Sequence, residues 1–310
     1  MSGTNNMDKK PILVVALGGN ALLKRGDPLE AGIQQKNILI AASVIAGLTA
    51  QWRVVLVHGN GPQVGLLALQ NAAYTSVNPY PLDVLGAETQ GMIGYMLQQA
   101  LKNCLPDTHI TTLLTQVKVD TLDPAFQDPC KFIGPLYSAD QLAALPADNP
   151  WQIKADGYGF RRVVPSPLPV SIVESAAIIT LLADDHLVIC NGGGGIPVTE
   201  GENGLQGVEA VIDKDQSAAL LARQLNADAL LILTDADAVY LNWNTPSQEA
   251  IAQTTASSLE ELRFDAGSMG PKVSACCRFV RQCHGIAGIG ALQDGCSILS
   301  GKKGTLIVAG

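Results

Sequence analysis

Short apolar runs rich in β-branched residues alternate along the chain with longer stretches in which apolar residues recur at helical spacing. The runs predict strands at residues 12–17, 53–58, 109–116, 186–190, 229–234 and 305–308, with a further strand near 285–290. The longer stretches predict helices at residues 31–50, 63–75, 88–102, 170–183, 214–225 and 270–282. Strands joined by helices of this length need crossover connections. The pattern therefore predicts an α/β fold, a three-layer sandwich around a mainly parallel central sheet.

Three of the predicted strands end in glycine-rich turns. The segments are LVVALGGNAL (13–22), VVLVHGNGPQVG (54–65) and LVICNGGGGIPV (187–198). Glycine leaves backbone N–H groups uncovered, and the N-terminus of a following helix adds partial positive charge, so each turn is typical of an anion site. In an open α/β sheet such turns gather beyond the carboxyl ends of the strands. The pattern predicts one shared site for anions, phosphate above all.

A proline-rich segment interrupts the alternation of strands and helices. Residues 118–169 contain eight of the 17 prolines, namely Pro124, Pro129, Pro135, Pro146, Pro150, Pro165, Pro167 and Pro169. A structureless loop of this length would be unusual in a compact domain, so we interpret the segment as a small inserted subdomain that acts as a lid. The polar residues 1–10 are interpreted as a frayed leader before the first strand.

Composition and charge exclude several classes of protein. The 310 residues are 47% apolar, which is ample for the core of a large globular domain. The net charge of −8 argues against nucleic-acid binding, for which a basic stripe is expected. No apolar run approaches the roughly 20 residues of a membrane span, and the N-terminus lacks the apolar core of a signal peptide. The seven cysteines lack paired metal spacing, so we expect reduced thiols in a cytoplasmic protein.

The glycine turns do not match the two common nucleotide motifs. A Walker A loop ends in Gly-Lys-Ser or Gly-Lys-Thr, whereas Gly301-Lys302 is followed by Lys303. The Rossmann spacing G-x-G-x-x-G also fails, because the glycine after Gly59 and Gly61 comes one residue late. Phosphate binding therefore requires another arrangement.

Six blocks of sequence resemble, in order, those of the carbamate kinases, a family of the amino-acid kinase superfamily. The blocks are ALGGNALL (16–23), HGNGPQVG (58–65), GGGGIPV (192–198), AVIDKD (210–215), TDADAVY (234–240) and GSMGPK (267–272), and the segment 123–135 adds DPAF and KFIGP. The resemblance covers nearly the whole chain. It implies a single amino-acid-kinase-like domain over residues 1–310, with the lid inserted at 118–169.

This resemblance implies reversible phosphoryl transfer between ATP and carbamate, which gives ADP and carbamoyl phosphate. It also implies Mg²⁺ held mainly by the nucleotide phosphates, with no metal site of the protein's own, and a homodimer. The family's usual role runs toward ATP synthesis in catabolism, for example in arginine breakdown. Phosphoryl transfer needs two anionic reactants held in line, and cations where charge spreads over the moving group.

The resemblance makes Lys131, Lys214 and Lys272 the candidate catalytic cations, converging on the transferred phosphoryl group and the nucleotide phosphates. Taken alone, each could equally be a solvated surface lysine. Asp215 is the candidate organiser of two ammonium groups, or a carboxylate that interacts with a helix dipole. Asp213 is either part of the site or simply the N-cap.

The glycine turns are expected to bind the two substrates. Because carbamate is small, its site needs backbone donors at close approach. The candidates for carbamate and the transferred phosphoryl group are Gly18, Gly19, Asn20, Gly59, Asn60 and Gly61. The neighbouring His58 is interpreted as structural, since carbamate is already an anionic nucleophile and needs no base.

A second set of residues is expected to bind the nucleotide. The candidates are Gly192, Gly193, Gly194, Thr234, Asp235, Asp237, Tyr240, Met269 and Lys272. For several of them another reading stays open. The glycines at 192–195 form an anion nest or merely a sharp turn, Asp235 and Asp237 could be turn formers, and Met269 could be a core residue.

Two other functions compete with the carbamate kinase reading. The chain could phosphorylate a larger carboxylate, such as an acylated amino acid, or it could be a non-catalytic nucleotide or metabolite sensor. The HGNGPQVG block and the Lys131 block favour carbamate. The three lysines and Asp215 argue against a sensor, which needs no phosphoryl clamp.

Overall fold

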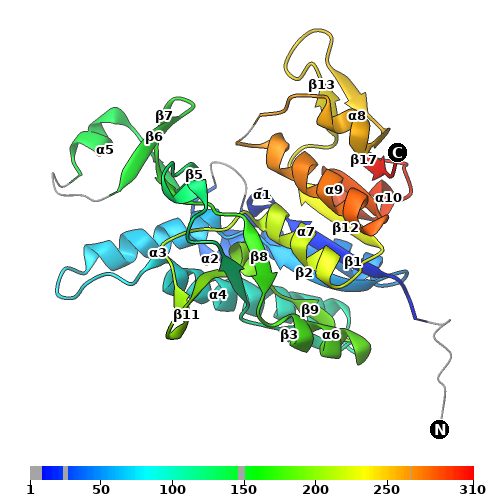
Figure 1. The fold of residues 1–310 in the computed structure, drawn as a ribbon, viewed down its shortest axis with the longest axis horizontal. Helices are drawn as coiled ribbons and strands as arrows, with labels where there is room; N and C mark the ends of the chain where they lie inside the picture. The colour runs from blue at the N-terminus through cyan, green and yellow to red at the C-terminus, as the bar shows by residue number, and fades with distance from the viewer. Residues whose placement is uncertain (1–8, 24–26, 146–150, 266) are drawn as a thin grey trace.

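The computed structural model describes residues 9–23, 27–145, 151–265 and 267–310 (Figure 1). Its centre is an eight-stranded sheet in the order β15-β17-β16-β12-β1-β2-β9-β3. All neighbouring strands in it run parallel except β16 and β17, which confirms the predicted mainly parallel sheet. The strands are β1 (Ile12–Leu17), β2 (Arg53–His58), β3 (Ile110–Thr112), β9 (Leu187–Ile189), β12 (Ala229–Thr234), β15 (Gln253–Thr255), β16 (Ile286–Ala291) and β17 (Thr305–Val308).

The central strand β1 shows why the sheet is covered on both faces. Val14 and Ala16 belong to one core cluster, whereas Leu13, Val15 and Leu17 belong to another. All five side chains are completely buried. Successive residues of a strand point to opposite faces, so an uninterrupted apolar run is what a sheet buried on both sides requires.

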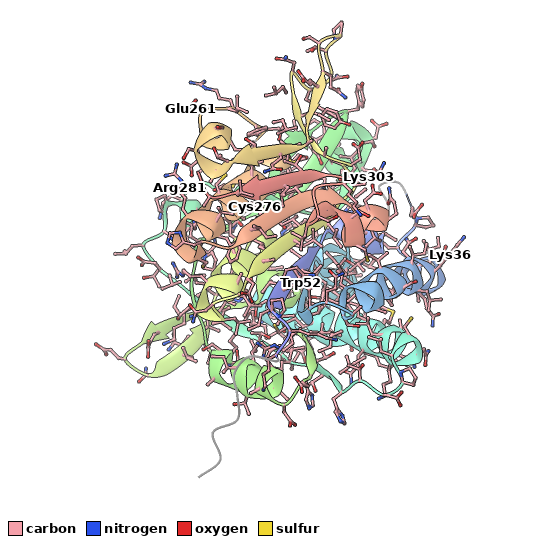
Figure 2. The ribbon with its side chains drawn as sticks, turned by 90° about the vertical axis from the view of Figure 1, so that its right-hand side faces the viewer. Lys36, Trp52, Glu261, Cys276, Arg281 and Lys303 are labelled. Carbon is pink, nitrogen blue, oxygen red and sulfur yellow. The ribbon has the colours of Figure 1, made fainter. Side chains whose placement is uncertain are left out.

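Helices cover the two faces of the sheet, so the predicted three-layer sandwich is confirmed. One core cluster includes residues of α2 and α4, and the other includes residues of α6, α7, α8 and α9. Figure 2 shows the sheet between the α9 side, labelled at Cys276, and the α2 side, labelled at Lys36. The helices are α1 (Gly19–Leu22), α2 (Ala31–Leu48), α3 (Gly61–Ala73), α4 (Leu82–Cys104), α5 (Ala139–Ala143), α6 (Ser175–Ala183), α7 (Lys214–Gln224), α8 (Ala256–Glu260), α9 (Met269–Cys283) and α10 (Gly295–Ile298), with short 3₁₀ helices η1 (Pro124–Phe126), η2 (Gly192–Gly194) and η3 (Leu292–Asp294).

Three smaller sheets surround the central one. A four-stranded sheet has the order β11-β10-β4-β8, a three-stranded sheet the order β5-β7-β6, and β13 pairs with β14. Their strands are β4 (Gln116–Val119), β8 (Pro169–Ile172), β10 (Ile196–Gly201) and β11 (Gly204–Gly207); β5 (Lys131–Tyr137), β6 (Gln152–Asp156) and β7 (Gly159–Val164); and β13 (Val239–Leu241) and β14 (Glu249–Ile251).

The three-stranded sheet and α5 form a lobe that projects from the body of the molecule (Figure 1). We call residues 131–145 and 151–164 the projecting lobe. It lies inside the segment 118–169, whose two ends are held together because β4 and β8 pair antiparallel. Residues 146–150 lie outside the described residues, and the action of the segment as a lid stays a prediction.

Two predicted elements were wrong. The single strand expected at 109–116 is divided into β3 and β4, which belong to different sheets, because the side chain of Gln90 holds Thr115 by both its N–H and its carbonyl. The helix expected at 170–183 begins only at Ser175. Residues before it form β8 against β4, and the Glu174 carboxylate accepts the Gln116 backbone N–H.

Two further expectations concern the leader at residues 1–10 and the lack of a membrane-spanning segment. Residues 1–8 of the predicted leader lie outside the described residues, while the Lys9 ammonium donates to the Ala183 carbonyl and Lys10 to that of Thr49. None of the described helices is both long and apolar enough to cross a membrane.

Candidate active site

The three glycine turns follow neighbouring strands of the sheet. Gly18 follows β1, Gly59 follows β2, and η2 lies just beyond β9, and these strands are adjacent and parallel. Their carboxyl ends therefore share one edge of the sheet, where ligands of open α/β folds bind. The three turns therefore gather at one edge of the sheet as predicted, while their binding of anions stays a prediction.

The first two turns touch each other and the stem of Lys214. A Cβ atom added at Gly59 would lie 2.9 Å from the Gly19 nitrogen and 3.4 Å from Cδ of Lys214. Any side chain at position 59 would push these groups apart. Asn20, expected beside them, lies in α1, but its side chain lies outside the described part of the chain.

The third turn packs against two polar side chains from the second. A Cβ atom at Gly192 would lie 2.5 Å from Nε2 of His58, and one at Gly193 would lie 2.1 Å from Nδ2 of Asn60. Gly193 also has a φ of +66°, a conformation that glycine adopts without strain. The glycines here let the backbone approach the β2 turn closely. Asn60 in turn donates to the Thr89 hydroxyl at 2.8 Å.

His58 has the environment of a structural histidine. It is 1% exposed, and its Nδ1 donates to the Gly59 carbonyl at 3.0 Å. Burial lowers the pKa of His58 to about 4, against a smaller opposing effect of the Gly59 hydrogen bond. The ring is therefore neutral at physiological pH, as its structural interpretation requires.

Two of the expected catalytic lysines share one buried carboxylate. Asp215, 2% exposed, accepts from Lys214 through Oδ1 and from the ammonium of Lys272 through Oδ2 at 3.1 Å. Lys214 and Asp215 belong to the first turn of α7, and Lys272 to the first turn of α9. One carboxylate thus joins the N-termini of two helices that pack on the same face of the sheet.

The third lysine reaches the same helix through the neighbouring carboxylate. Lys131, at the start of β5, donates to Oδ2 of Asp213 at 2.5 Å. The other oxygen of Asp213 accepts the backbone N–H of Asp215 at 2.9 Å and of Gln216 at 3.2 Å. Asp213 is therefore the N-cap of α7, as one sequence interpretation has it, and also the ion-pair partner of Lys131, while its part in a functional site stays a prediction.

The ionisation of this cluster follows from burial and from the opposite charges within it. Burial lowers the pKa of Lys214, the Asp215 charge opposes this, and the Lys272 charge lowers it further. For Lys131, burial acts to lower the pKa, but the charge and hydrogen bond of Asp213 outweigh it and raise the pKa. Burial acts to raise the pKa of Asp213, but the charges of Lys131 and Lys214 bring it below the ordinary range.

The expected nucleotide residues at the end of β12 lie beside the first glycine turn. The Gly18 N–H donates to the Leu233 carbonyl at 2.8 Å, and a Cβ atom at Gly18 would lie 3.6 Å from Cα of Thr234. The Thr234 hydroxyl donates to Asp235 at 2.9 Å. This strand end therefore adjoins the turn expected to bind the smaller substrate.

Three other expected nucleotide residues come later in the chain than the end of β12. They are Asp237, Tyr240 and Met269. The Tyr240 hydroxyl donates to the Asp237 carboxylate at 2.9 Å, and the Tyr240 ring lies beside Trp243. Met269 is the first residue of α9 and packs on the core, as its alternative interpretation has it.

Three buried polar residues of the site were missed by sequence reasoning. Gln90 of α4 donates to the Gly192 carbonyl at 3.0 Å, and Asn191, at a φ of 49°, donates to the Ser217 hydroxyl at 2.8 Å. Gln63, in the first turn of α3, is 3% exposed, and neither polar atom of its side chain has a partner among the described residues. For Gln63 and Gln90 the available signal was a polar residue on an otherwise buried helix face, whereas Asn191 lies between β9 and η2 and gave no such signal.

The site can hold a small anion against backbone donors and can place three ammonium groups beside it. Both carboxylates of the cluster accept hydrogen bonds at both oxygens, Asp213 from Lys131 and the α7 backbone and Asp215 from the other two lysines. This is chemistry suited to the transfer of a negatively charged group, because the cations are fixed in advance.

Known proteins are similar to this chain in sequence and in fold. The profile of the Amino acid kinase family matches residues 11–287. A carbamate kinase from Rhizobium meliloti (strain 1021) is 53% identical over 95% of this chain and 92% of its own. Another from Escherichia coli O6:H1 is 56% identical over 95% and 98%.

A solved structure agrees with these relatives. The carbamate kinase from Giardia lamblia bound to AMP-PNP superposes with a TM-score of 0.88 at 41% identity, over 97% of this chain and 99% of that one. The chain belongs to the amino acid kinase family and, within it, to the carbamate kinases, which makes it an ATP-dependent phosphotransferase.

Proposed function

We propose that the protein catalyses reversible phosphoryl transfer between ATP and carbamate, giving ADP and carbamoyl phosphate. The observation that carries the proposal is the gathering of Lys131, Lys214 and Lys272 around two adjacent carboxylates. Its support from relatives is that proteins more than half identical bear the name carbamate kinase, and that the Giardia lamblia structure is bound to AMP-PNP.

The acceptor is proposed to lie against the first two glycine turns. Gly18, Gly19 and Asn20 follow β1, and Gly59, Asn60 and Gly61 follow β2 and open α3. The Gly59 N–H already donates to the Leu17 carbonyl at 3.0 Å, so the acceptor is proposed to approach other backbone N–H groups of the two turns. The absence of side chains on the glycines would let a small anion such as carbamate come close to them.

The nucleotide is proposed to lie against the third turn and the end of β12. Gly192, Gly193 and Gly194 would line its phosphates, with backbone donors from Gly192 and Gly193, since the Gly194 N–H already donates to the Asn191 carbonyl at 2.9 Å. The remaining contacts are assigned to Thr234, Asp235, Asp237, Tyr240, Met269 and Lys272. The Giardia lamblia structure bound to AMP-PNP supports a nucleotide site in this fold.

Positive charge is what the cluster contributes to the reaction. Three ammonium groups face two carboxylates, so the cluster carries an excess positive charge of one if all five groups are ionised. The two reactants are both anions and repel each other until cations neutralise them. Lys214 and Lys272, fixed by Asp215, would stabilise charge on the transferring group, and Lys131 would approach it from the projecting lobe.

Mg²⁺ is proposed to arrive with the nucleotide. All four carboxylate oxygens of Asp213 and Asp215 already accept hydrogen bonds from lysines or the α7 backbone. Because these carboxylates are already engaged, we propose that the phosphates of ATP or ADP, and not the carboxylates, supply most ligands of the cation. When bound, the cation would neutralise part of the phosphate charge.

The projecting lobe is proposed to act as a lid. It supplies Lys131, and closing it over the acceptor would exclude water that otherwise hydrolyses a reactive acyl phosphate. The test is a pair of structures with and without substrates. A lobe that occupies the same position in both, with Lys131 unmoved, would overturn gating.

A homodimer is proposed through α4 and β3. β3 is an edge strand of the central sheet, and α4 beside it exposes Tyr95 (62%) and Met92 (37%). A hollow of about 410 Å³ on this face, lined in part by Tyr95 and Thr112, could receive a side chain of a second copy. Light scattering should give twice the chain mass, and Tyr95→Glu should shift it toward the monomer.

The cell compartment and direction of the reaction are also proposals. All seven cysteines are free thiols in the structure, which favours the reducing cytoplasm. We place the reaction in catabolism, running toward ATP, as in arginine breakdown.

The experiment that tests the function measures ATP formation. Protein, ADP and Mg²⁺ are mixed with carbamoyl phosphate, and in a parallel reaction with acetyl phosphate. We expect rapid ATP formation with carbamoyl phosphate and slow formation with acetyl phosphate. Equal rates would favour a less selective carboxylate kinase, and no ATP with either would favour a sensor.

A further inference from the structure

Asp213 makes two kinds of contact that a simple helix cap does not combine. Its Oδ1 accepts the backbone N–H groups of Asp215 and Gln216, and its Oδ2 accepts the ammonium of Lys131. Serine, threonine or asparagine would cap the helix equally well. The second contact, with a lysine 82 positions away in sequence, needs a carboxylate.

The backbone on both sides of this ion pair is constrained by local contacts. At the start of α7, Asp213 itself orders the first turn. In β5, Gly134 lies so close to α3 that a Cβ atom on Gly65 would be 2.0 Å from its Cα. The strand is therefore already packed against α3 at this point. The flexible stem of Lys131 spans from the strand to Asp213, which holds its ammonium.

Asp213 also lies between two cations of the cluster. The charges of Lys131 and Lys214 both act on it, and its own charge acts on each of them. Asp215 forms ion pairs with Lys214 of α7 and Lys272 of α9. Asp213 supplies the negative charge that pairs with the lysine of the projecting lobe. Figure 1 shows these origins: β5 at the base of the lobe, and α7 and α9 on the body.

We propose that Asp213 is a positioning residue for the phosphoryl-transfer reaction. Through one oxygen it orders the turn that carries Lys214 and Asp215, and through the other it holds the Lys131 ammonium at the edge of that cluster. The inference rests on the proposed function. It assigns to Asp213 the coupling between the lobe and the catalytic helix.

The kinetic test separates the ion pair from the cap. Asp213→Asn and Asp213→Ser keep a capping side chain and remove the charge. We expect both to melt near the wild-type temperature, to lower kcat about tenfold or more, and to change the KM for ADP less than about twofold. Asp213→Glu, which restores the charge, should recover part of kcat.

A double variant identifies the residue through which Asp213 acts. If Asp213 acts through Lys131, the double variant Lys131→Met with Asp213→Asn should have a kcat within about twofold of the kcat of Lys131→Met alone. Losses that multiply in the double variant would overturn the proposal. So would Asn and Ser variants with wild-type kcat, or variants whose lost activity follows lost folding.

Amine labelling tests the same contact without the reaction. Reductive methylation followed by mass spectrometry compares Lys131 with the exposed Lys36 of α2. We expect Asp213→Asn to speed labelling of Lys131 several-fold relative to Lys36, and an unchanged ratio would contradict the proposal. If the wild type makes no ATP from carbamoyl phosphate, the proposed function fails, while this labelling still reports on the ion pair.

Discussion

At the residue scale, the candidate site depends on the neighbouring carboxylates of Asp213 and Asp215, each of which pairs with different lysines. Asp215 was expected from the sequence to organise two lysines, and the structure pairs it with Lys214 and Lys272. The partner of Lys131 could not be predicted, because Asp213 lies 82 residues away and an aspartate before a helix is most simply read as a cap. Motifs identify residue types, whereas only the fold decides which of them meet.

Removing one of the shared lysines should stop turnover without unfolding the protein. We expect Lys214→Met or Lys272→Met to lower kcat about 100-fold or more, because each variant removes a cation beside the transferring charge. Circular dichroism should remain unchanged, and the exposed Lys303→Met serves as the matched control. Turnover within a few-fold of wild type would refute the catalytic assignment of the substituted lysine.

The pH dependence of kcat should report on Lys214. Burial lowers its pKa from the ordinary value of 10.5, so kcat should fall as the pH rises through that lowered pKa, before free lysine would titrate. Lys214→Arg keeps its proton at higher pH, so its alkaline limb should move upward even if its maximum is smaller. Identical alkaline limbs in the two proteins would show that another group sets them.

The close contact of two turns makes Gly59 intolerant of a side chain. Gly59→Ala would bring a methyl group to 2.9 Å from the Gly19 nitrogen, so the turns must separate. We expect a loss of activity and a lower melting temperature. Gly32→Ala in α2, where nothing lies within 4 Å of the added atom, is the control and should not destabilise the protein. Equal behaviour of the two variants would contradict the tight packing.

At the scale of elements, local pattern predicts strands and helices well where they are continuous. The strands 12–17, 53–58, 229–234 and 305–308 were predicted with their observed bounds. The pattern failed at 109–116 because a distant side chain, Gln90, draws the chain into a second sheet. It failed at 170–183 because residues near 170 pair with β4, a contact that sequence periodicity does not contain.

Besides Asp213, the Glu209 side chain links the projecting lobe to the body and should control the mobility of the lobe. Glu209 accepts from the Arg162 guanidinium of β7 at 3.3 Å and from the Leu82 N–H at the start of α4 at 2.8 Å. Since this carboxylate is half exposed, Glu209→Gln should cost less than about 1 kcal/mol of global stability. Hydrogen exchange should nevertheless become faster in β6 and β7 and stay unchanged in β1. Unchanged exchange in the lobe would exclude Glu209 as a latch.

At the scale of the whole molecule, the parallel sheet places three glycine turns and three lysines at one edge. The sequence predicted the mainly parallel sheet and the convergence of the turns, because both follow from the strand–helix alternation. It did not predict that β17 runs antiparallel to β16 or that Asp213 joins the lobe to α7. Those features depend on pairings between segments far apart in the chain.

The lysine cluster is proposed to move a phosphoryl group directly between ADP and carbamate. Phosphorus NMR follows this in one tube containing protein, Mg²⁺, ADP and carbamoyl phosphate. We predict that the carbamoyl phosphate signal declines as the γ-phosphate signal of ATP grows, and that ATP with carbamate approaches the same equilibrium from the other side. Loss of carbamoyl phosphate into inorganic phosphate alone, at a rate no faster than without protein, would show that this protein does not transfer the phosphoryl group to ADP.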